Sequence, residues 1–390
     1  MADATPQLEG ITVLNLASVG PAARASRTLA DYGARVIQIS PTSKKGAKQI
    51  QPPFHSYGAG RGFERLQIDL KAEAGRDALL RLASRSDVVI ESYRPGVVKR
   101  LGISFEDLRE VNSGLIYCST SGYGQDGASS NWVGHDINYL AMSGLLACTE
   151  PREDGGPPIP GATIADSAGG GMQAVVAILA ALVRRSLGGE AQYLDVSATD
   201  GVLSLMSLSI DQYLATGEVA APRKVLLTGR YAFYDLYRCK DGKWISVGAI
   251  EPHFFKSLCD LLGLSEYVAY QMDDAKQDEM RAAFRSRFLE QDRDVWVSEL
   301  ADKNTCVAPV YEIPELVEDP HFKERGVFME SEHPIEGRFR QVGPVLAGGI
   351  RGQGVQKVNS FDQSDARTVL EWAGYAPPEI EKLCLDGAVE

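Results

Sequence analysis

Short apolar runs alternate with segments of helical periodicity along the first half of the chain. Apolar runs suited to buried parallel strands cover residues 10–18, 35–39, 87–92, 114–125 and 192–197. Apolar residues recur at helical spacing over 22–32, 69–83, 97–101, 172–185 and 200–215. The first strand–helix–strand unit is typical of a right-handed βαβ crossover. The pattern therefore predicts an α/β fold with a Rossmann-like parallel sheet in a large domain.

The turns that follow the predicted strands belong on one edge of this sheet. They read SVGPAA, SYRPG and SGYGQDG, and His135 comes shortly after the last of them. In an open parallel sheet, ligands bind beyond the carboxyl ends of the strands, so this edge is the expected binding site. The first turn lacks the G-x-G-x-x-G fingerprint, which disfavours a nicotinamide or flavin cofactor.

The pattern changes in the second half of the chain. Two strand-like segments, 232–238 and 244–249, are joined by a Lys-Asp-Gly turn that favours a hairpin, and helical patterns follow. This is typical of a small α+β domain. The predicted organisation is a large domain of 1–215 and 331–390, a linker of 216–230, a small domain of 231–316 and a return linker of 317–330.

Residues 41–65 form an expected loop that is rich in glycine and carries five Lys or Arg residues. One interpretation is an ordinary solvated loop. The other is a surface patch for phosphate groups, which is an unusual feature in an acidic protein.

The stretch 133–171 carries the candidate chemistry. His135 precedes a helix-like run, a loop rich in proline and glycine follows, and Asp166 then comes just before three glycines and a long apolar segment. An Asp at that place is typical of a helix N-cap, and we expect the free N–H groups at 166–169 to bind an oxyanion. The glycines would let a ligand approach the backbone. A base, an acid and an oxyanion site suffice for proton abstraction beside a carbonyl group.

Composition narrows the class of protein. The chain has 390 residues and a formal net charge of −12, which disfavours nucleic acid as a partner. The six cysteines are scattered singly, without metal-ligand spacing, so no metal site is expected and the thiols are expected to be reduced. No apolar run is expected to reach membrane-spanning length, and the N-terminus has no secretory pattern. We therefore expect a cytoplasmic protein with no membrane partner.

Several motifs together resemble one family. They are LEGITVLNLASVGPAA, SYRPGVVKRLGISFEDL, LIYCSTSGYGQDG, GHDINYLAMSG, GATIADSAGGG and GAIEPHFF, in this order over roughly residues 8–345. The chain resembles the family III coenzyme A transferases, also called the CaiB/BaiF family, and within it the α-methylacyl-CoA racemase branch. The resemblance implies a Rossmann-like large domain, a smaller domain and an interlocked homodimer with an active site shared between subunits.

The resemblance also implies roles for three residues. The racemases carry a His in GHDINY and an Asp in the glycine-rich segment, which are His135 and Asp166 here, and a Glu in GAIEPxF, which is Glu251. It implies that His135 and Asp166 exchange the C2 proton of a 2-methyl-branched acyl-CoA through an enolate, without a cofactor beyond the coenzyme A of the substrate. Glu251, from the partner subunit, would orient the His135 imidazole. The competing interpretation of Glu251 is an acid at a helix N-terminus.

Coenzyme A contacts are expected around the same edge of the sheet. Arg94 is the leading candidate for the phosphate or ribose, with Arg61 and Arg65 next. Asp136 is also a candidate contact, although a structural role is its other interpretation. The full predicted set is Arg94, Arg61, Arg65, Gly134, Asp136, Tyr139 and Gly169. The other four histidines, His55, His253, His321 and His333, are expected to be surface or packing residues.

Two other functions stay open. A family III CoA transferase would use Asp166 as a nucleophile that carries the acyl group between carboxylic acids, and His135 would then be incidental. A protein that binds a CoA ester without turning it over is the other alternative. For the racemase itself, a sterol-derived acyl group stays open beside a branched fatty acyl chain.

Overall fold

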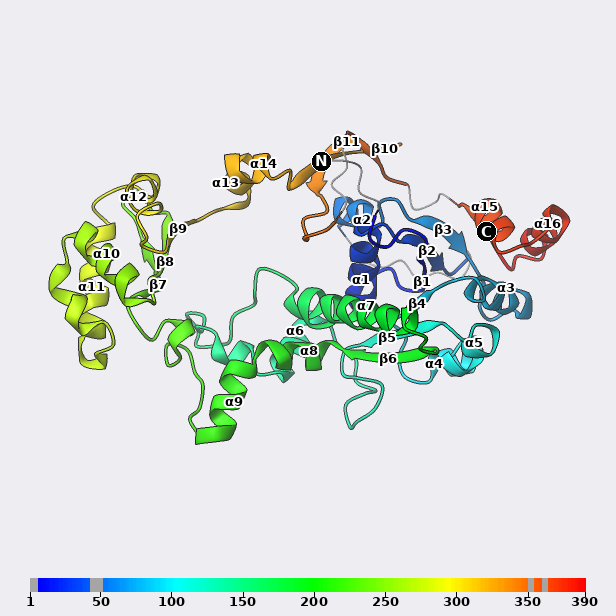
Figure 1. Ribbon diagram of the computed structural model, residues 1–390, viewed down its shortest axis with the longest axis horizontal. Helices are drawn as coiled ribbons and strands as arrows, with labels where there is room; N and C mark the ends of the chain where they lie inside the picture. The colour runs from blue at the N-terminus through cyan, green and yellow to red at the C-terminus, as the bar shows by residue number, and fades with distance from the viewer. Residues whose placement is uncertain (1–5, 43–51, 350–353, 360–363) are drawn as a thin grey trace. The chain divides into compact units, whose positions relative to one another are not determined.

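The computed structural model describes residues 6–42, 52–349, 354–359 and 364–390. The chain folds into two compact units. The first consists of Met1–Ser143, Pro160–Leu205 and His321–Glu390, and the second of Gly144–Ile159 and Met206–Pro320. Figure 1 shows the elements of each unit along the chain.

The first unit is built on a six-stranded sheet whose paired strands are all parallel. The strand order β3-β2-β1-β4-β5-β6 is that of a Rossmann fold. The strands are β1 (Thr12–Asn15), β2 (Arg35–Ser40), β3 (Glu64–Gln67), β4 (Val88–Glu91), β5 (Ile116–Ser121) and β6 (Gln192–Ser197). The α/β prediction is confirmed, and the order in which successive strands are added reverses between β1 and β4.

Helices cover both faces of this sheet (Figure 1). The helices of this unit are α1 (Gly20–Asp31), α2 (Pro53–Ala59), α3 (Glu73–Ala83), α4 (Val97–Leu101), α5 (Phe105–Val111), α6 (Asp136–Met142), the π-helix η2 (Ala165–Met172), α7 (Gln173–Ser186), α8 (Ala198–Leu205), α15 (Ala366–Trp372) and α16 (Pro377–Leu385). A small sheet of β10 (Phe328–His333), β11 (Gly337–Val342) and β12 (Gln356–Lys357) belongs to the same unit.

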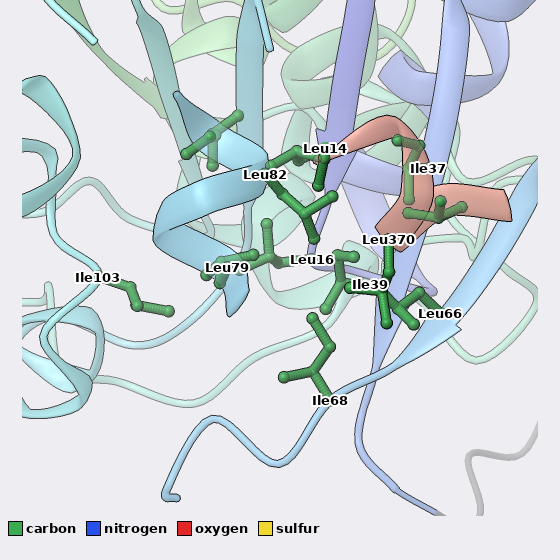
Figure 2. Packing of buried hydrophobic residues seen from close by; sticks show 14 of the residues in the cluster. Leu14, Leu16, Ile37, Ile39, Leu66, Ile68, Leu79, Leu82, Ile103 and Leu370 are labelled. Atoms are coloured by element: carbon green, nitrogen blue, oxygen red, sulfur yellow. The ribbon is translucent and has the colours of Figure 1, made fainter. Parts of the chain in front are cut away.

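Alternation of side chains along the strands produces two apolar cores. Leu14 of β1 and Ile37 of β2 pack on one face with α3 and α15, as Figure 2 shows. Their neighbours Val13 and Val36 point to the opposite face and pack with α1 and α7. The four inner strands β1, β2, β4 and β5 are therefore buried on both sides, which is why the sequence shows continuous apolar runs there.

The second unit contains a three-stranded antiparallel sheet of order β7-β8-β9. Its elements are η1 (Leu146–Cys148), α9 (Ser207–Thr216), η3 (Leu226–Thr228), β7 (Tyr234–Arg238), β8 (Trp244–Gly248), α10 (Pro252–Leu262), η4 (Ser265–Tyr270), η5 (Asp274–Lys276), α11 (Gln277–Phe288), α12 (Arg293–Leu300), β9 (Val307–Val310) and α13 (Ile313–Glu318), and α14 (Pro320–Glu324) begins at its boundary. The β7–β8 hairpin agrees with the Lys-Asp-Gly turn.

The predicted domain limits stay predictions, and the compact units differ from them in two segments. Residues 144–159 and 206–215 group with the second unit. One cause is an ion pair between Glu150 and Arg223, whose Oε2 and Nε atoms lie 3.1 Å apart within that unit.

Two local predictions from the sequence are wrong. Residues 41–65 are not a loop throughout, because α2 and the edge strand β3 lie within or at the end of this stretch; its part 43–51 is outside the described residues. The expectation that no apolar run reaches membrane-spanning length also fails. Ala165–Ser186 is a continuous helical stretch of 22 residues that, by length and composition alone, is long and apolar enough to cross a membrane. Its buried side chains on α7, Ala174, Val175, Ile178 and Ala181, pack in the core beside β5 and β6, which accounts for part of the apolar composition.

Candidate active site

His135 lies at the start of α6, beyond the carboxyl end of β5. It is the N-cap residue, with extended backbone, and its own N–H donates to Asn138 Oδ1 at 3.0 Å. His135 is exposed to solvent. The sequence prediction of a helix that begins at His135 is confirmed, and the helix start fixes the histidine backbone at this edge of the sheet.

Asp166 lies in the first turn of η2, where the N-cap is Ile164. The prediction that Asp166 itself caps the helix is therefore wrong by two residues. The cap function is taken by Asp136, whose Oδ1 accepts a hydrogen bond from the Asp166 backbone N–H at 2.8 Å. Because Asp136 follows His135 directly, this bond ties the start of α6 to the start of η2.

The predicted oxyanion site at 166–169 loses its first two donors. The Asp166 N–H is bound to Asp136, and the Ser167 N–H donates to the Thr163 carbonyl at 3.0 Å. A donor that already has a good partner is not available to a developing negative charge. The N–H groups of Asp166 and Ser167 are therefore occupied, and an oxyanion site at residues 168–169 stays a prediction.

The Asp166 carboxyl group is half-buried and interacts with three charged neighbours. Burial raises its pKa, Arg24 lowers it, Asp136 raises it and His135 lowers it. Arg24 is held nearby by a 2.7 Å hydrogen bond from its guanidinium to Thr163 Oγ1. His135 and Asp166, 31 positions apart in the sequence, thus belong to one electrostatic cluster.

Tyr139 of α6 lies next to this group of charged residues. Its hydroxyl donates to the Gly134 carbonyl at 2.6 Å, and its ring lies edge-on to Tyr123 at 5.1 Å. Burial, with the charges of Asp166 and Asp136, raises the pKa of Tyr139 to about 12. Gly134 has no room for a side chain, because a Cβ there would lie 2.8 Å from both tyrosines. These contacts give Gly134 and Tyr139 packing roles, and their contacts with coenzyme A stay predictions.

Gly169 and Gly170 of η2 serve helix packing, whereas Gly171 lines the cavity beside Asp166. A Cβ at Gly169 would lie 2.6 Å from the Ala198 carbonyl oxygen of α8, and one at Gly170 would lie 2.6 Å from Pro21 of α1. Both glycines are buried. The structure therefore gives no support to a coenzyme A contact at Gly169.

A cavity of about 590 Å³ opens beside Asp166 within the first unit. Its wall is formed by the start and one face of α1, by α2, by η2 and by β11. Arg24, Arg27, His55 and Arg61 line it together with Asp31 and Asp166. Burial and the charge of Arg24 lower the pKa of His55. The sequence analysis missed Arg24 and His55; the only available signal was that both flank turns or loops at the expected edge.

The three arginines predicted to contact coenzyme A lie in different surroundings. Arg61 is buried and bound to Asp31 at 2.9 Å and to the Gly58 carbonyl at 3.1 Å, so its guanidinium is largely engaged in the fold. Arg65 is half-buried beside Asp365, and burial lowers its pKa. Arg94 is exposed in the turn between β4 and α4, at the carboxyl edge where the sequence analysis placed it.

A buried acid in this edge was also missed. Glu91 ends β4, is 1% exposed, accepts a 2.6 Å hydrogen bond from the Tyr93 N–H and is bonded to Ser119 of β5. Ser119 Oγ in turn accepts from Gln125 Nε2 at 2.8 Å. Burial raises the pKa of Glu91 to about 7. Glu91 therefore anchors the turn that carries Arg94 and the SGYGQDG turn, and the only sequence signal was an acid at the end of an apolar run.

Glu251 lies in the second unit. It is the N-cap residue of α10, directly before Pro252, and is exposed. This position agrees with the alternative interpretation as an acid at a helix N-terminus, and its predicted role toward His135 stays a prediction. No group of His, Cys, Asp and Glu that could hold a metal ion occurs among the residues that the structure describes.

Comparison with known proteins now identifies the family. Residues 8–353 match the model described as CoA-transferase family III. The chain belongs to this family. It is 35% identical over 387 residues to the α-methylacyl-CoA racemase of Homo sapiens, with 98% of this chain and 97% of the relative covered, and 32% identical to that of Mus musculus, with 98% and 97% covered. It is also 28% identical to the succinyl-CoA:glutarate CoA-transferase of Mus musculus, with 100% and 91% covered.

Solved structures agree with the fold. A CaiB/BaiF family protein from Brucella suis matches with a TM-score of 0.70 and 25% identity, covering 92% of this chain and 93% of its own. The protein Rv3272 from M. tuberculosis matches with a TM-score of 0.76 and 24% identity, covering 91% and 97%. Relatives in the family include both racemases and CoA transferases, so the chain is similar to enzymes that act on CoA thioesters.

Proposed function

We propose that the protein is an α-methylacyl-CoA racemase that epimerises C2 of 2-methyl-branched acyl-CoA thioesters. The observation that carries the proposal is the 2.8 Å hydrogen bond from the Asp166 N–H to Asp136, the neighbour of His135, which links the two candidate acid/bases at a cavity that Asp166 lines. The 35% and 32% identities to racemases, against 28% to a CoA transferase, support the same choice.

In the proposed reaction, one of the two residues removes the C2 proton and the other returns a proton to the opposite face. The C–H electron pair moves toward the thioester carbonyl and forms an enolate, and the second proton transfer restores the C–H bond with inverted configuration. Arg24 holds Asp166 toward its ionised form, which a base requires, and the Asp136 hydrogen bond fixes the backbone that carries Asp166. The reaction needs no cofactor beyond the coenzyme A of the substrate.

We also propose a homodimer with a shared active site. Glu251 of the partner subunit would then face His135 and favour its imidazolium form. Exposed apolar side chains on the η2–α7 stretch support this dimer, because an apolar surface exposed in a single chain is typical of an interface. Met172 is 46% exposed, Val176 62% and Val183 61%. Arg94 is the proposed contact for the phosphate or ribose of coenzyme A.

The test is incorporation of deuterium at C2 of a 2-methylacyl-CoA in heavy water. Wild type should incorporate label and epimerise C2, and His135→Ala and Asp166→Ala should lose most of the epimerisation rate. Arg184→Ala, at an exposed position near the end of α7, is the control and should keep the rate. Absence of label, together with acyl exchange onto an added carboxylic acid that needs only Asp166, would instead identify a CoA transferase.

A further inference from the structure

One face of α1 lines the cavity beside Asp166 with charged side chains. Arg24, Arg27 and Asp31 follow each other at spacings of three and four residues, so they lie on the same side of the helix. Arg61 comes from the turn after α2 and reaches the same wall. The cavity beside Asp166 is therefore lined by three arginine side chains, Arg24, Arg27 and Arg61.

These cations outnumber the carboxylates. Arg27 and Arg61 both pair with one acid, Asp31, at 2.6 Å and 2.9 Å. Burial, together with the charge of Arg61, lowers the pKa of Arg27 to about 10 against the opposing effect of Asp31. Arg24 is coupled to Asp166. The cavity thus has one positive charge in excess, in a chain whose formal net charge is −12.

All three guanidinium groups have an unused donor. The Nε atoms of Arg24, Arg27 and Arg61 are buried, and none of them has a hydrogen-bond partner among the described residues. The cavity wall nearby is apolar, with Val19, Phe54 and Met172. Burying a cationic donor beside apolar side chains is costly unless an anion completes the pairing. The arrangement is therefore complementary to an anionic oxygen group on a partly apolar ligand.

We propose that this cavity receives a carboxylate carried by the acyl part of the substrate, so that the preferred substrate is a 2-methyl-branched dicarboxylic acid bound to coenzyme A through one carboxyl group. This inference rests on the proposed racemase function and names its substrate class. Arg27 binds the free carboxylate, and Arg24 lies between that position and Asp166.

The position of the cations favours an acyl carboxylate over a phosphate of coenzyme A. Asp166 has to reach C2, so the reacting carbon lies at the same cavity wall. Arg24 and Arg27 are three residues apart, about 4.5 Å along the helix axis. The phosphates are separated from the thioester by the long pantetheine arm, whereas an acyl carboxylate is a few bonds from C2. Because Asp166 and Arg27 line the same cavity, we assign the anion held there to the acyl group.

A matched pair of thioesters tests the proposal. In 2-methylglutaryl-CoA a terminal carboxylate takes the place of the terminal methyl group of 2-methylpentanoyl-CoA. Dissociation constants for both are measured by titration calorimetry, and C2 deuterium exchange is measured alongside. Wild type should bind the carboxylate thioester at least about tenfold more tightly, as expected for a charged hydrogen bond. Arg27→Met should remove this preference, Arg27→Lys should keep part of it, and Arg184→Met should keep all of it.

Equal affinity of wild type for the two thioesters would overturn the proposal, and this result decides the matter even if Arg27→Met fails to fold. Equal weakening of both thioesters in a folded Arg27→Met variant would also overturn it, because it would place a coenzyme A phosphate in the cavity. The two proposals fail separately. A binding preference without C2 exchange rejects the racemase and keeps the carboxylate site, whereas exchange without a preference does the reverse.

Discussion

Asp136 Oδ1 accepts a hydrogen bond of 2.8 Å from the backbone N–H of Asp166. The residue next to one proposed acid/base thus positions the backbone of the other. A rigid link of this kind matters because small errors in the position of a catalytic group reduce the rate strongly.

The first prediction concerns this link. Asp136→Ala removes the acceptor and leaves the Asp166 N–H without its partner, so we expect a loss of about 1–2 kcal/mol in the free energy of unfolding and roughly a 10- to 100-fold loss in kcat. Asp136→Asn keeps an acceptor oxygen and should retain most of the stability. Urea unfolding and C2 exchange rates measure both effects, and equal behaviour of the Ala and Asn variants would show that the bond is unimportant.

The second prediction concerns Arg24. Arg24 lowers the pKa of Asp166, so Arg24→Met should raise that pKa and leave less ionised base at a given low pH. The acidic limb of the kcat/KM profile for C2 exchange should therefore move to higher pH. Arg24→Lys keeps the charge and should move the limb less. A profile that does not move in Arg24→Met would contradict the assigned interaction.

The third prediction uses Glu91. Because its pKa in the folded protein is about 7, above its ordinary value of 4.5, the folded state binds this proton more tightly than the unfolded state. The contribution of this proton to the free energy of unfolding is at its maximum below pH 4.5 and is lost as the pH rises to about 7. Its total size is at most about 3 kcal/mol. Glu91→Gln cannot ionise, so its free energy of unfolding should fall less over this window. Denaturant unfolding at several pH values measures the difference, and parallel curves for both proteins would contradict it.

The fourth prediction concerns the packing of η2. Gly169→Ala places a methyl group 2.6 Å from the Ala198 carbonyl oxygen, so it should destabilise the protein by about 1–3 kcal/mol. Gly161→Ala is the control, because a Cβ there has nothing within 4 Å. Thermal unfolding compares the two variants, and a Gly169→Ala protein as stable as the control would mean that η2 and α8 are less closely packed.

The sequence predicted the sheet well because buried parallel strands such as β1 and β4 are continuous apolar runs. It did not predict β3, because this edge strand contains the charged residues Glu64 and Arg65 and has no continuous apolar run. It located His135 and Asp166 from local helix and turn patterns. It could not show that Asp136 occupies the Asp166 N–H, or that Arg24, Arg27 and Asp31 face the same cavity, because these contacts depend on how distant helices pack.

The most direct test of the central claim follows the two stereoisomers of a 2-methylacyl-CoA separately in heavy water. If His135 and Asp166 stand on opposite faces of C2, each variant that keeps one base should exchange the C2 proton of one stereoisomer without inverting it, and wild type should epimerise both. Exchange of both stereoisomers by His135→Ala, at the wild-type rate and with inversion, would contradict the two-base mechanism.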